Sequence, residues 1–182
     1  MNRVRASRSR LLAALATGAA CLCMLQPSRA EVVASGANGF LLRHELKISR
    51  GAAAAYARLV RVQDWWSSDH TYSGSAARLS LQAHPGGCWC EKLPDGGFVQ
   101  HMQVVYAAPG KALRLVGGLG PLQAMGVSGA LTFTLKADSA DVTRVTVSYA
   151  VSGFAPEGFA ELARAVDAVL AEQLARYVAA PA

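Results

Sequence analysis

The stretch that decides the fold is residues 65–101, which read WWSSDHTYSGSAARLSLQAHPGGCWCEKLPDGGFVQH. All three tryptophans lie in it, although the chain as a whole is rich in small and aliphatic residues. Pro94-Asp95-Gly96-Gly97 has strong turn chemistry. The runs that flank it, 87–93 and 98–107, are therefore predicted to pair as a β-hairpin.

Further strands and a short helix are predicted on both sides of this hairpin. Apolar residues alternate near the end of Phe40–Ile48, which predicts the first strand. Good helix formers follow over 52–62, with apolar residues at helical spacing. Additional strands are expected over 77–83, 112–117, 131–135 and 145–149.

A long amphipathic helix is predicted after Pro156. Its apolar face runs from Phe159 to Tyr177, which corresponds to about five turns at 3.6 residues per turn. A curved sheet can bury its concave face only against such a helix. The predicted fold class is therefore α+β, with a curved antiparallel sheet wrapped around a long C-terminal helix and short helices after the first strand.

This layout resembles the helix-grip fold of the START-like superfamily, in particular the branch that includes polyketide cyclases and Hsp90 ATPase activator-like domains. The resemblance covers 39–180, and it implies an apolar cavity between sheet and helix in which family members bind lipids, polyketides, hormones or proteins. No catalytic signature is among the stretches that carry it. The stretches that carry the resemblance are Trp65-Trp66, His70-Thr-Tyr-Ser-Gly74, Gly86-Gly87-Cys-Trp-Cys-Glu91, Pro109-Gly110, and Val166-Asp167 to Leu174.

The composition agrees with an unfilled interior, because seventeen glycines and many alanines leave few large side chains to fill it. Small-molecule pockets combine apolar walls with a few polar groups that orient the ligand. The polar groups are expected to be His70, Glu91 and His101. The apolar contacts are expected from Trp65, Trp66, Tyr72, Trp89, Met102, Phe133, Tyr149 and Phe159. The competing interpretation is that these aromatic residues fill the core.

Cys88 and Cys90 lie on one face of the predicted strand, and Trp89 and Glu91 lie on the other. On an ideal strand, the Cα atoms of two same-face neighbours are about 6.5–7 Å apart, at the upper edge of disulfide geometry. Two free or weakly oxidising thiols are therefore favoured over a disulfide.

The register of the hairpin decides what His101 faces. A two-residue turn places Cys90 opposite His101, so that Cys88, Cys90 and His101 form a metal half-site. Against this, the Cys-x-Cys gap is shorter than in zinc knuckles, and the pattern offers no fourth ligand. A shift of one residue places His101 on the face of Glu91 instead, where the two form a buried hydrogen bond suited to acid–base chemistry. We expect neither a metal nor another cofactor.

The loop over 117–129 is apolar and rich in glycine. Its Gly118-Leu-Gly120-Pro-Leu-Gln123 segment lacks the third glycine of a dinucleotide-binding loop and precedes a strand. The apolar side chains from Leu119 to Val127 suit a lid over the cavity or a docking surface for a protein. A Gly-x-Ser-x-Gly nucleophile elbow is absent from the sequence.

Three functions are compatible with these features. The first is binding of a small apolar or amphipathic ligand, such as a lipid, without turnover. The second is a polyketide cyclase-like enzyme in which His101 or Glu91 acts as general base on an enolisable substrate. The third is docking of an envelope protein through Leu119–Val127.

Residues 1–30 have the architecture of a secretory signal peptide, with Arg3, Arg5, Arg8 and Arg10 at the start, an apolar run over 11–25, and Ser28-Arg29-Ala30 before the cleavage point. The run is shorter than the roughly 20 residues of a spanning helix, so no stable membrane anchor is expected after cleavage. The protein is thus predicted to be exported, to the periplasm. Residues 31–38 are expected to be a flexible lead-in.

Removal of residues 1–30 changes the charge balance. Five of the eighteen Lys and Arg residues lie there, while all twelve Asp and Glu residues follow, which leaves a net charge of +1. No nucleic-acid partner is expected from this balance.

Overall fold

The computed structural model describes residues 29–179. Most of the predicted signal peptide, residues 1–28, lies outside the described residues. Among those described, no helix has the length and apolar character to span a membrane. In chain order the elements are β1 (Arg29–Gly36), β2 (Gly39–Ile48), α1 (Ala52–Leu59), η1 (Val62–Asp64), η2 (Ser68–His70), η3 (Ala76–Arg78), β3 (Leu79–Leu81), β4 (Cys88–Lys92), β5 (Phe98–Ala108), β6 (Ala112–Gly117), η4 (Gly120–Ala124), β7 (Val127–Ser139), β8 (Val142–Gly153) and α2 (Ala160–Ala179).

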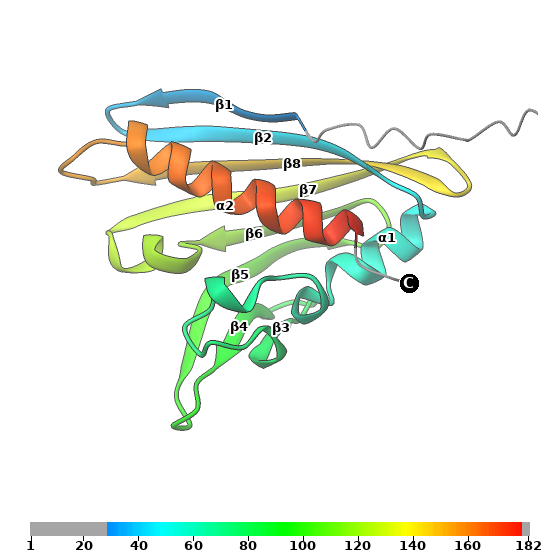
Figure 1. Cartoon of the computed structure of the whole chain (residues 1–182), viewed down its shortest axis with the longest axis horizontal. Helices are drawn as coiled ribbons and strands as arrows, with labels where there is room; N and C mark the ends of the chain where they lie inside the picture. Colours follow the sequence, from blue (N-terminus) through cyan, green and yellow to red (C-terminus); the bar gives the residue numbers. More distant parts are fainter. Residues whose placement is uncertain (1–28, 180–182) are drawn as a thin grey trace, which may run out of the picture.

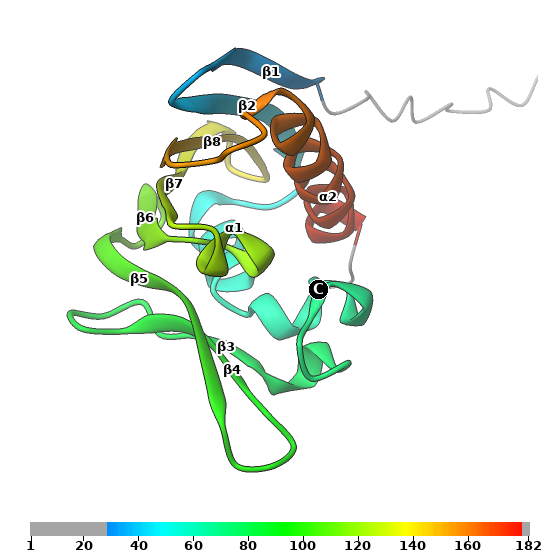
Figure 2. The same cartoon turned by 90° about the vertical axis from the view of Figure 1, so that its left-hand side faces the viewer.

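Eight antiparallel strands form one sheet in the order β1-β2-β8-β7-β6-β5-β4-β3. After β2 the chain crosses to the far edge through α1 and three short 3-10 helices, and it then returns strand by strand until β8 pairs with β2. Figure 2 shows the sheet curling, with α2 and the segment between α1 and β3 on its concave side. The crossover therefore brings residues 62–78 close to α2.

The fold class is α+β, as predicted, and the predicted hairpin is β4 and β5. The alternating runs over 131–135 and 145–149 are the central parts of β7 and β8. Both strands extend beyond these runs because they pair with each other from Val127–Gly153 to Ser139–Val142. The helix expected over 52–62 ends at Leu59 and is followed by a 3-10 turn.

The expectation of a flexible lead-in over 31–38 is wrong for most of that range. Residues 29–36 form β1, which pairs with β2, and Ala37-Asn38 make the turn. Val32 packs against the core, but the next residue is an equally apolar valine and only small residues follow it, so no alternating pattern appears. Backbone pairing with β2 therefore stabilises a strand that the side-chain pattern does not indicate.

The core is closed beside the N-terminal end of α2, where rings from β2, β8 and the residue before α2 meet. The ring of Phe40 contacts those of Tyr149 and Phe159 at centroid distances of 6.3 and 6.1 Å. The C-terminal end of α2 is tied to α1, because Tyr177 Oη donates to the carbonyl of Ala55 at 2.8 Å. Figure 1 shows α2 lying obliquely across the sheet, so its two sides meet different strands.

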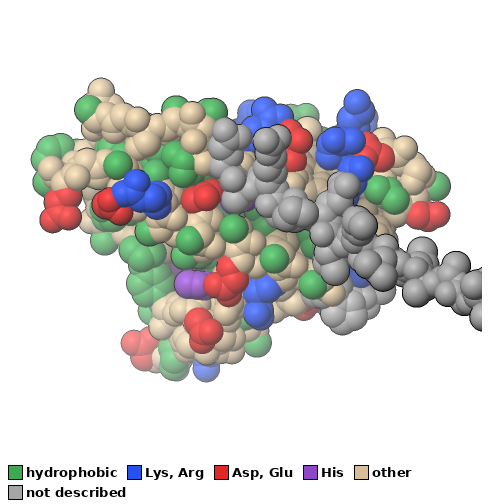
Figure 3. All heavy atoms as spheres, turned by 45° about the horizontal axis from the view of Figure 1, so that its top comes forward, with side chains coloured by type: hydrophobic (Ala, Val, Ile, Leu, Met, Phe, Trp, Pro, Cys, Tyr) green, Lys and Arg blue, Asp and Glu red, His purple; other side chains and the backbone are tan. Residues whose placement is uncertain are grey.

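Charged side chains of both signs are interspersed over the face seen in Figure 3. The basic side chains visible there do not gather into one continuous patch within the described part of the chain. This face therefore offers no single-sign surface that would select a partner by charge.

Candidate functional site

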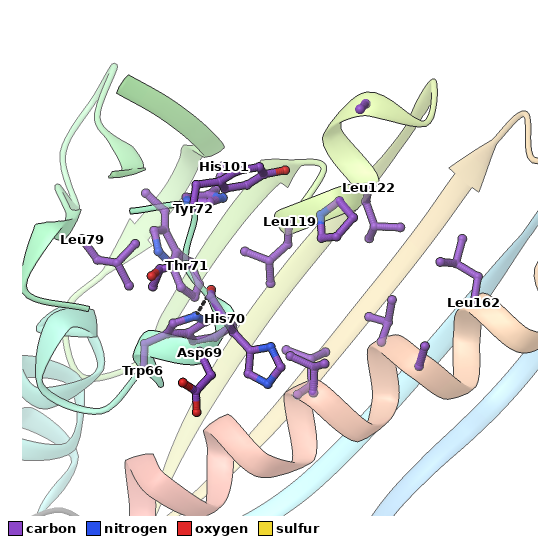
Figure 4. A pocket seen from close by; sticks show the side chains of 18 residues that line it. Trp66, Asp69, His70, Thr71, Tyr72, Leu79, His101, Leu119, Leu122 and Leu162 are labelled. Atoms are coloured by element: carbon purple, nitrogen blue, oxygen red, sulfur yellow. Dashed lines mark hydrogen bonds between the residues drawn. The ribbon is translucent and has the colours of Figure 1, made fainter. Parts of the chain in front are cut away.

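A cavity of about 590 Å³ lies between α2, the loop around η4, and the wall formed by β3–β5 with the segment after α1. Figure 4 shows the side chains of these three walls directed toward one another. The lining residues are Leu162, Ala165, Val166, Val169 and Leu170 of α2; Leu119, Gly120, Pro121, Leu122 and Ala124 around η4; and Trp66, Asp69, His70, Thr71, Tyr72, Leu79, Trp89 and His101.

The polar lining residues all come from one wall. Asp69, His70, Thr71 and Tyr72 belong to the segment after α1, and His101 belongs to β5. In Figure 4 the labelled residues of α2 and η4, such as Leu162 and Leu122, lie away from His101 and Tyr72. The cavity is therefore amphipathic, with an apolar side and a polar side.

The polar wall is held against α2 by three contacts. Ser67 N donates to Gln173 Oε1 at 2.7 Å, and Arg176 Nε donates to the carbonyl of Trp65 at 3.1 Å. His70 Nε2 lies 3.2 Å from Glu172 Oε2 at the surface. Because Gln173 and Ser67 are buried, the first of these contacts is the main anchor of the segment.

The three tryptophans form a cluster, of which Trp66 and Trp89 are part of this wall and Trp65 lies outside the lining. Trp66 and Trp89 meet nearly at right angles, with centroids 4.8 Å apart, and Trp65 packs behind Trp66 at 5.7 Å. The indole N–H of Trp65 donates to the carbonyl of Leu59, and that of Trp66 donates to the carbonyl of His70. The indole nitrogen of Trp89 has no such partner among the described residues.

The loop around η4 folds back on itself and forms one wall of the cavity. A Cβ at Gly118 would lie 2.7 Å from the backbone nitrogen of Gln123, so a glycine is needed for this close approach. Leu119 N donates to Tyr149 Oη at 3.2 Å, which fixes the loop to the sheet. Leu122 is buried, whereas Met125 is exposed. The loop thus directs part of its apolar surface inward.

Glu91 and His101 form a buried pair at the polar wall. Trp89 pairs with Met102 and Cys90 pairs with Gln100, so His101 is the extra residue of a β-bulge in β5. The bulge turns both His101 and Met102 to the inside of the sheet. His101 Nε2 lies 3.0 Å from Glu91 Oε2. The structure therefore follows the second of the two registers considered from the sequence.

Glu91 is an ionised acceptor in this arrangement. Its oxygens accept from the backbone N–H groups of Ser73 and Tyr72 as well as from His101. Burial raises the pKa of Glu91, but the hydrogen bonds from Ser73, His101 and Tyr72 together outweigh it, so the pKa lies below its ordinary value. Burial lowers the pKa of His101 by more than Glu91 raises it, so the imidazole is neutral near pH 7.

A second buried histidine lies outside the cavity. His44 Nε2 on β2 is 2.9 Å from Asp167 Oδ1 on α2, but the two atoms are not aligned for a hydrogen bond. Burial lowers the pKa of His44, and Asp167 only partly compensates. This contact belongs to the packing of α2 on the sheet.

Cys88 and Cys90 are joined by a disulfide, so the expectation of two free thiols is corrected. Their Cα atoms are 5.4 Å apart, closer than in an ideal strand, because β4 departs from regular pairing opposite the bulge. The half-site of Cys88, Cys90 and His101 does not form, since His101 faces Glu91. Among residues 29–179, no group of three or more His, Cys, Asp or Glu side chains is placed to hold a metal ion.

The predicted ligand contacts divide into two groups. Trp66, His70, Tyr72, Trp89 and His101 line the cavity. The others lie away from the lining: Trp65, Met102, Phe133, Tyr149 and Phe159 are core residues, and Glu91 supports His101 from behind. The lining residues of α2 were missed as ligand contacts, although the helical spacing of Leu162, Val166 and Val169 had placed them on its apolar face.

No family model matches the chain, and no curated protein sequence matches it. Solved structures do match. One is EF2215 from Enterococcus faecalis, a conserved protein of unknown function, with a TM-score of 0.56 and 17% identity over 83% of this chain and 74% of that one. Another is CalU16 from Micromonospora echinospora, with a TM-score of 0.51 and 9% identity over 85% of this chain and 87% of that one.

A third match is BexL, a di-domain ARO/CYC from the BE-7585A biosynthetic pathway, with a TM-score of 0.54 and 15% identity over 76% of this chain. This chain covers 45% of BexL, so the match is to part of the di-domain protein. Identities this low establish likeness of fold alone. They support the α+β arrangement of a curved antiparallel sheet with a C-terminal helix.

Proposed function

We propose that this chain is a START-like, helix-grip protein that binds a small apolar or amphipathic molecule between α2 and the sheet. The observation that carries the proposal is the cavity of about 590 Å³, whose size is within the range of small-molecule pockets. Most of its lining is apolar, with a few polar groups on one wall. The likeness of fold to BexL, an ARO/CYC of a biosynthetic pathway, adds support for a small-molecule ligand.

Export to the periplasm is part of the same proposal. The signal-like sequence of residues 1–30 supports it. A disulfide between Cys88 and Cys90 also suits an oxidising compartment. Mass spectrometry of protein recovered from the periplasm should give a chain that begins at Glu31. Recovery of the uncleaved chain from the cytoplasm alone would contradict export.

Filling the cavity tests the binding proposal. Ala165 lies on α2, is exposed and lines the cavity, whereas Ala168 is also exposed on the same helix but is outside the lining. Ala165→Trp should weaken the binding of an apolar fluorescent probe such as 1-anilinonaphthalene-8-sulfonate at least about tenfold, because the new indole ring fills part of the cavity that the probe would occupy. Ala168→Trp should leave the affinity unchanged. Equal effects of the two variants, or no binding by the unmodified protein, would contradict the proposal.

The Glu91–His101 pair favours one second candidate, an enzyme that removes a proton from an enolisable ligand. His101 is neutral near pH 7, lines the cavity and is oriented by a carboxylate, which is the arrangement of a general base. Proton exchange at the α-carbon of 2-tetralone in D₂O, followed by NMR, tests it. His101→Phe should remove a rate enhancement of roughly 10²–10⁴. Exchange no faster than without protein would exclude this chemistry for that probe.

A further inference from the structure

Two buried polar atoms at the polar wall lack hydrogen-bond partners within residues 29–179. They are Trp89 Nε1 and His101 Nδ1. Both residues line the cavity, and only 1% of Trp89 and 5% of His101 is exposed. Because buried polar atoms are nearly always paired, two such atoms in one cavity wall indicate a missing partner.

The chemistry of the two atoms is fixed by their surroundings. An indole N–H can only donate. His101 Nε2 faces the carboxylate of Glu91, which can only accept, so the ring proton sits on Nε2 and donates to Glu91. His101 Nδ1 therefore carries a lone pair and can only accept. The wall thus presents one donor and one acceptor.

The two side chains belong to adjacent strands. Trp89 of β4 pairs across the sheet with Met102, and His101 is the bulged residue beside Met102. Both Trp89 and His101 face the concave side, where the cavity lies. The ring of Tyr72 lies against that of His101, with centroids 5.9 Å apart, and is itself exposed. Tyr72 therefore packs against His101 on a side that reaches solvent.

A hydroxyl group matches the chemistry of both atoms, because its oxygen can accept from an N–H such as Trp89 Nε1 and its proton can be donated to a lone pair such as that of His101 Nδ1. An ether or ketone can only accept and leaves His101 unpaired. A carboxylate can also only accept, and it would bring a second negative charge toward Glu91. A hydrocarbon leaves both atoms unpaired.

We propose that the cavity selects an apolar ligand that carries an alcohol or phenol hydroxyl, bound between Trp89 and His101 with its apolar body along α2 and η4. This inference rests on the proposed function, since it names the class of molecule that the same cavity takes. A water molecule has the same donor and acceptor capacity. A ligand hydroxyl can replace that water without losing its hydrogen bonds, whereas a methyl group cannot.

The test compares 2-naphthol with 2-methylnaphthalene, which has the same shape but no hydrogen-bonding group, and with 2-naphthoate. Dissociation constants are measured for the unmodified protein, for Trp89→Phe and for Trp65→Phe. Trp65 is a matched control, because its N–H already donates to Leu59 and it lies outside the lining. For each protein, the dissociation constant of 2-naphthol is divided by that of 2-methylnaphthalene. The probes differ in hydrophobicity by the same amount in every protein, so a change in this ratio between proteins reports the hydrogen bond.

In the unmodified protein, 2-naphthol should bind more tightly than 2-methylnaphthalene, and 2-naphthoate should bind least. Trp89→Phe should reduce the preference for 2-naphthol about tenfold, as expected for a lost hydrogen bond in a buried site. Trp65→Phe should leave the preference unchanged. A second readout does not depend on a variant: the indole N–H resonance of Trp89 should shift with 2-naphthol and much less with 2-methylnaphthalene.

The failures of the two proposals are distinguishable. If all three probes bind and Trp89→Phe leaves their ratios unchanged, the hydroxyl proposal is overturned while the cavity stands as a binding site. If 2-naphthoate binds most tightly, the wall recognises an anion and the proposal is overturned. If none of the probes binds at millimolar concentration, the proposed function itself fails.

Discussion

The two sides of the concave face differ in how α2 meets them. Beside β2 and β8 the space is filled by large rings, with Phe40 in contact with both Tyr149 and Phe159. Toward β4 and β5 the walls include small residues such as Ala165 and Ala124, and about 590 Å³ stays unfilled. One helix therefore closes a core along one side and lines a cavity along the other. Stability should depend on the first side, and ligand choice on the second.

Truncation of one apolar side chain in the closed core and one at the cavity gives the largest expected difference in the free energy of unfolding. Phe133 on β7 is fully buried in the closed core, so Phe133→Ala should lower the free energy of unfolding by about 3–5 kcal/mol. Val166 lines the cavity and is only partly buried, so Val166→Ala should cost about 1 kcal/mol or less. Urea unfolding of both variants provides the comparison. A cost for Val166→Ala that equals that of Phe133→Ala would mean that the cavity is collapsed in solution.

Glutamates that contact histidines offer the next contrast. Glu91→Ala leaves the N–H groups of Tyr72 and Ser73 and the ring of His101 without their buried acceptor, so it should cost about 3 kcal/mol. Glu172→Ala removes only a solvent-exposed contact with His70 and should cost less than about 1 kcal/mol. The midpoints of guanidinium unfolding test this order. Similar midpoints for the two variants would show that Glu91 is not an anchor of the polar wall.

The buried histidines predict how stability depends on pH. The pKa values of His44 and His101 are lowered in the folded state, mainly by burial. Below about pH 6.5 the unfolded chain therefore binds more protons than the folded protein does. The contribution of these histidines to the free energy of unfolding is fully present above about pH 6.5, and it is lost as the pH falls through the folded pKa values.

The slope for each histidine cannot exceed about 1.4 kcal/mol per pH unit, which corresponds to one proton taken up by the unfolded chain alone. Measurements of the free energy of unfolding from pH 7.5 to pH 5 test this, with His44→Leu as the control that removes one of the two contributions. A free energy that stays constant over this range would show that the histidines are not buried as described.

Sequence periodicity predicted most of the elements, with β1 as an exception, but it did not predict the division between core and cavity. Alternation correctly placed Cys88 and Cys90 opposite Trp89 and Glu91, because strand geometry alone determines which side chains share a face. It could not decide between the two registers considered for His101 or predict the bulge there, because both depend on pairing between strands. The sequence also could not separate Phe133 and Tyr149, which fill the core, from Trp66 and Trp89, which line the cavity. That division depends on the oblique position of α2.

The two faces of β4 supply the smallest expected effect. The disulfide of Cys88 and Cys90 lies on the face opposite Trp89, and it closes a loop of only a few residues. Replacing both cysteines by serine should therefore lower the free energy of unfolding by only about 1–2 kcal/mol. The affinity for 2-naphthol should change less than about twofold, because the cavity is lined by Trp89 and not by the sulfur atoms. A tenfold or larger change in affinity would show that the disulfide sets the position of Trp89, so that the outer face of β4 controls the cavity.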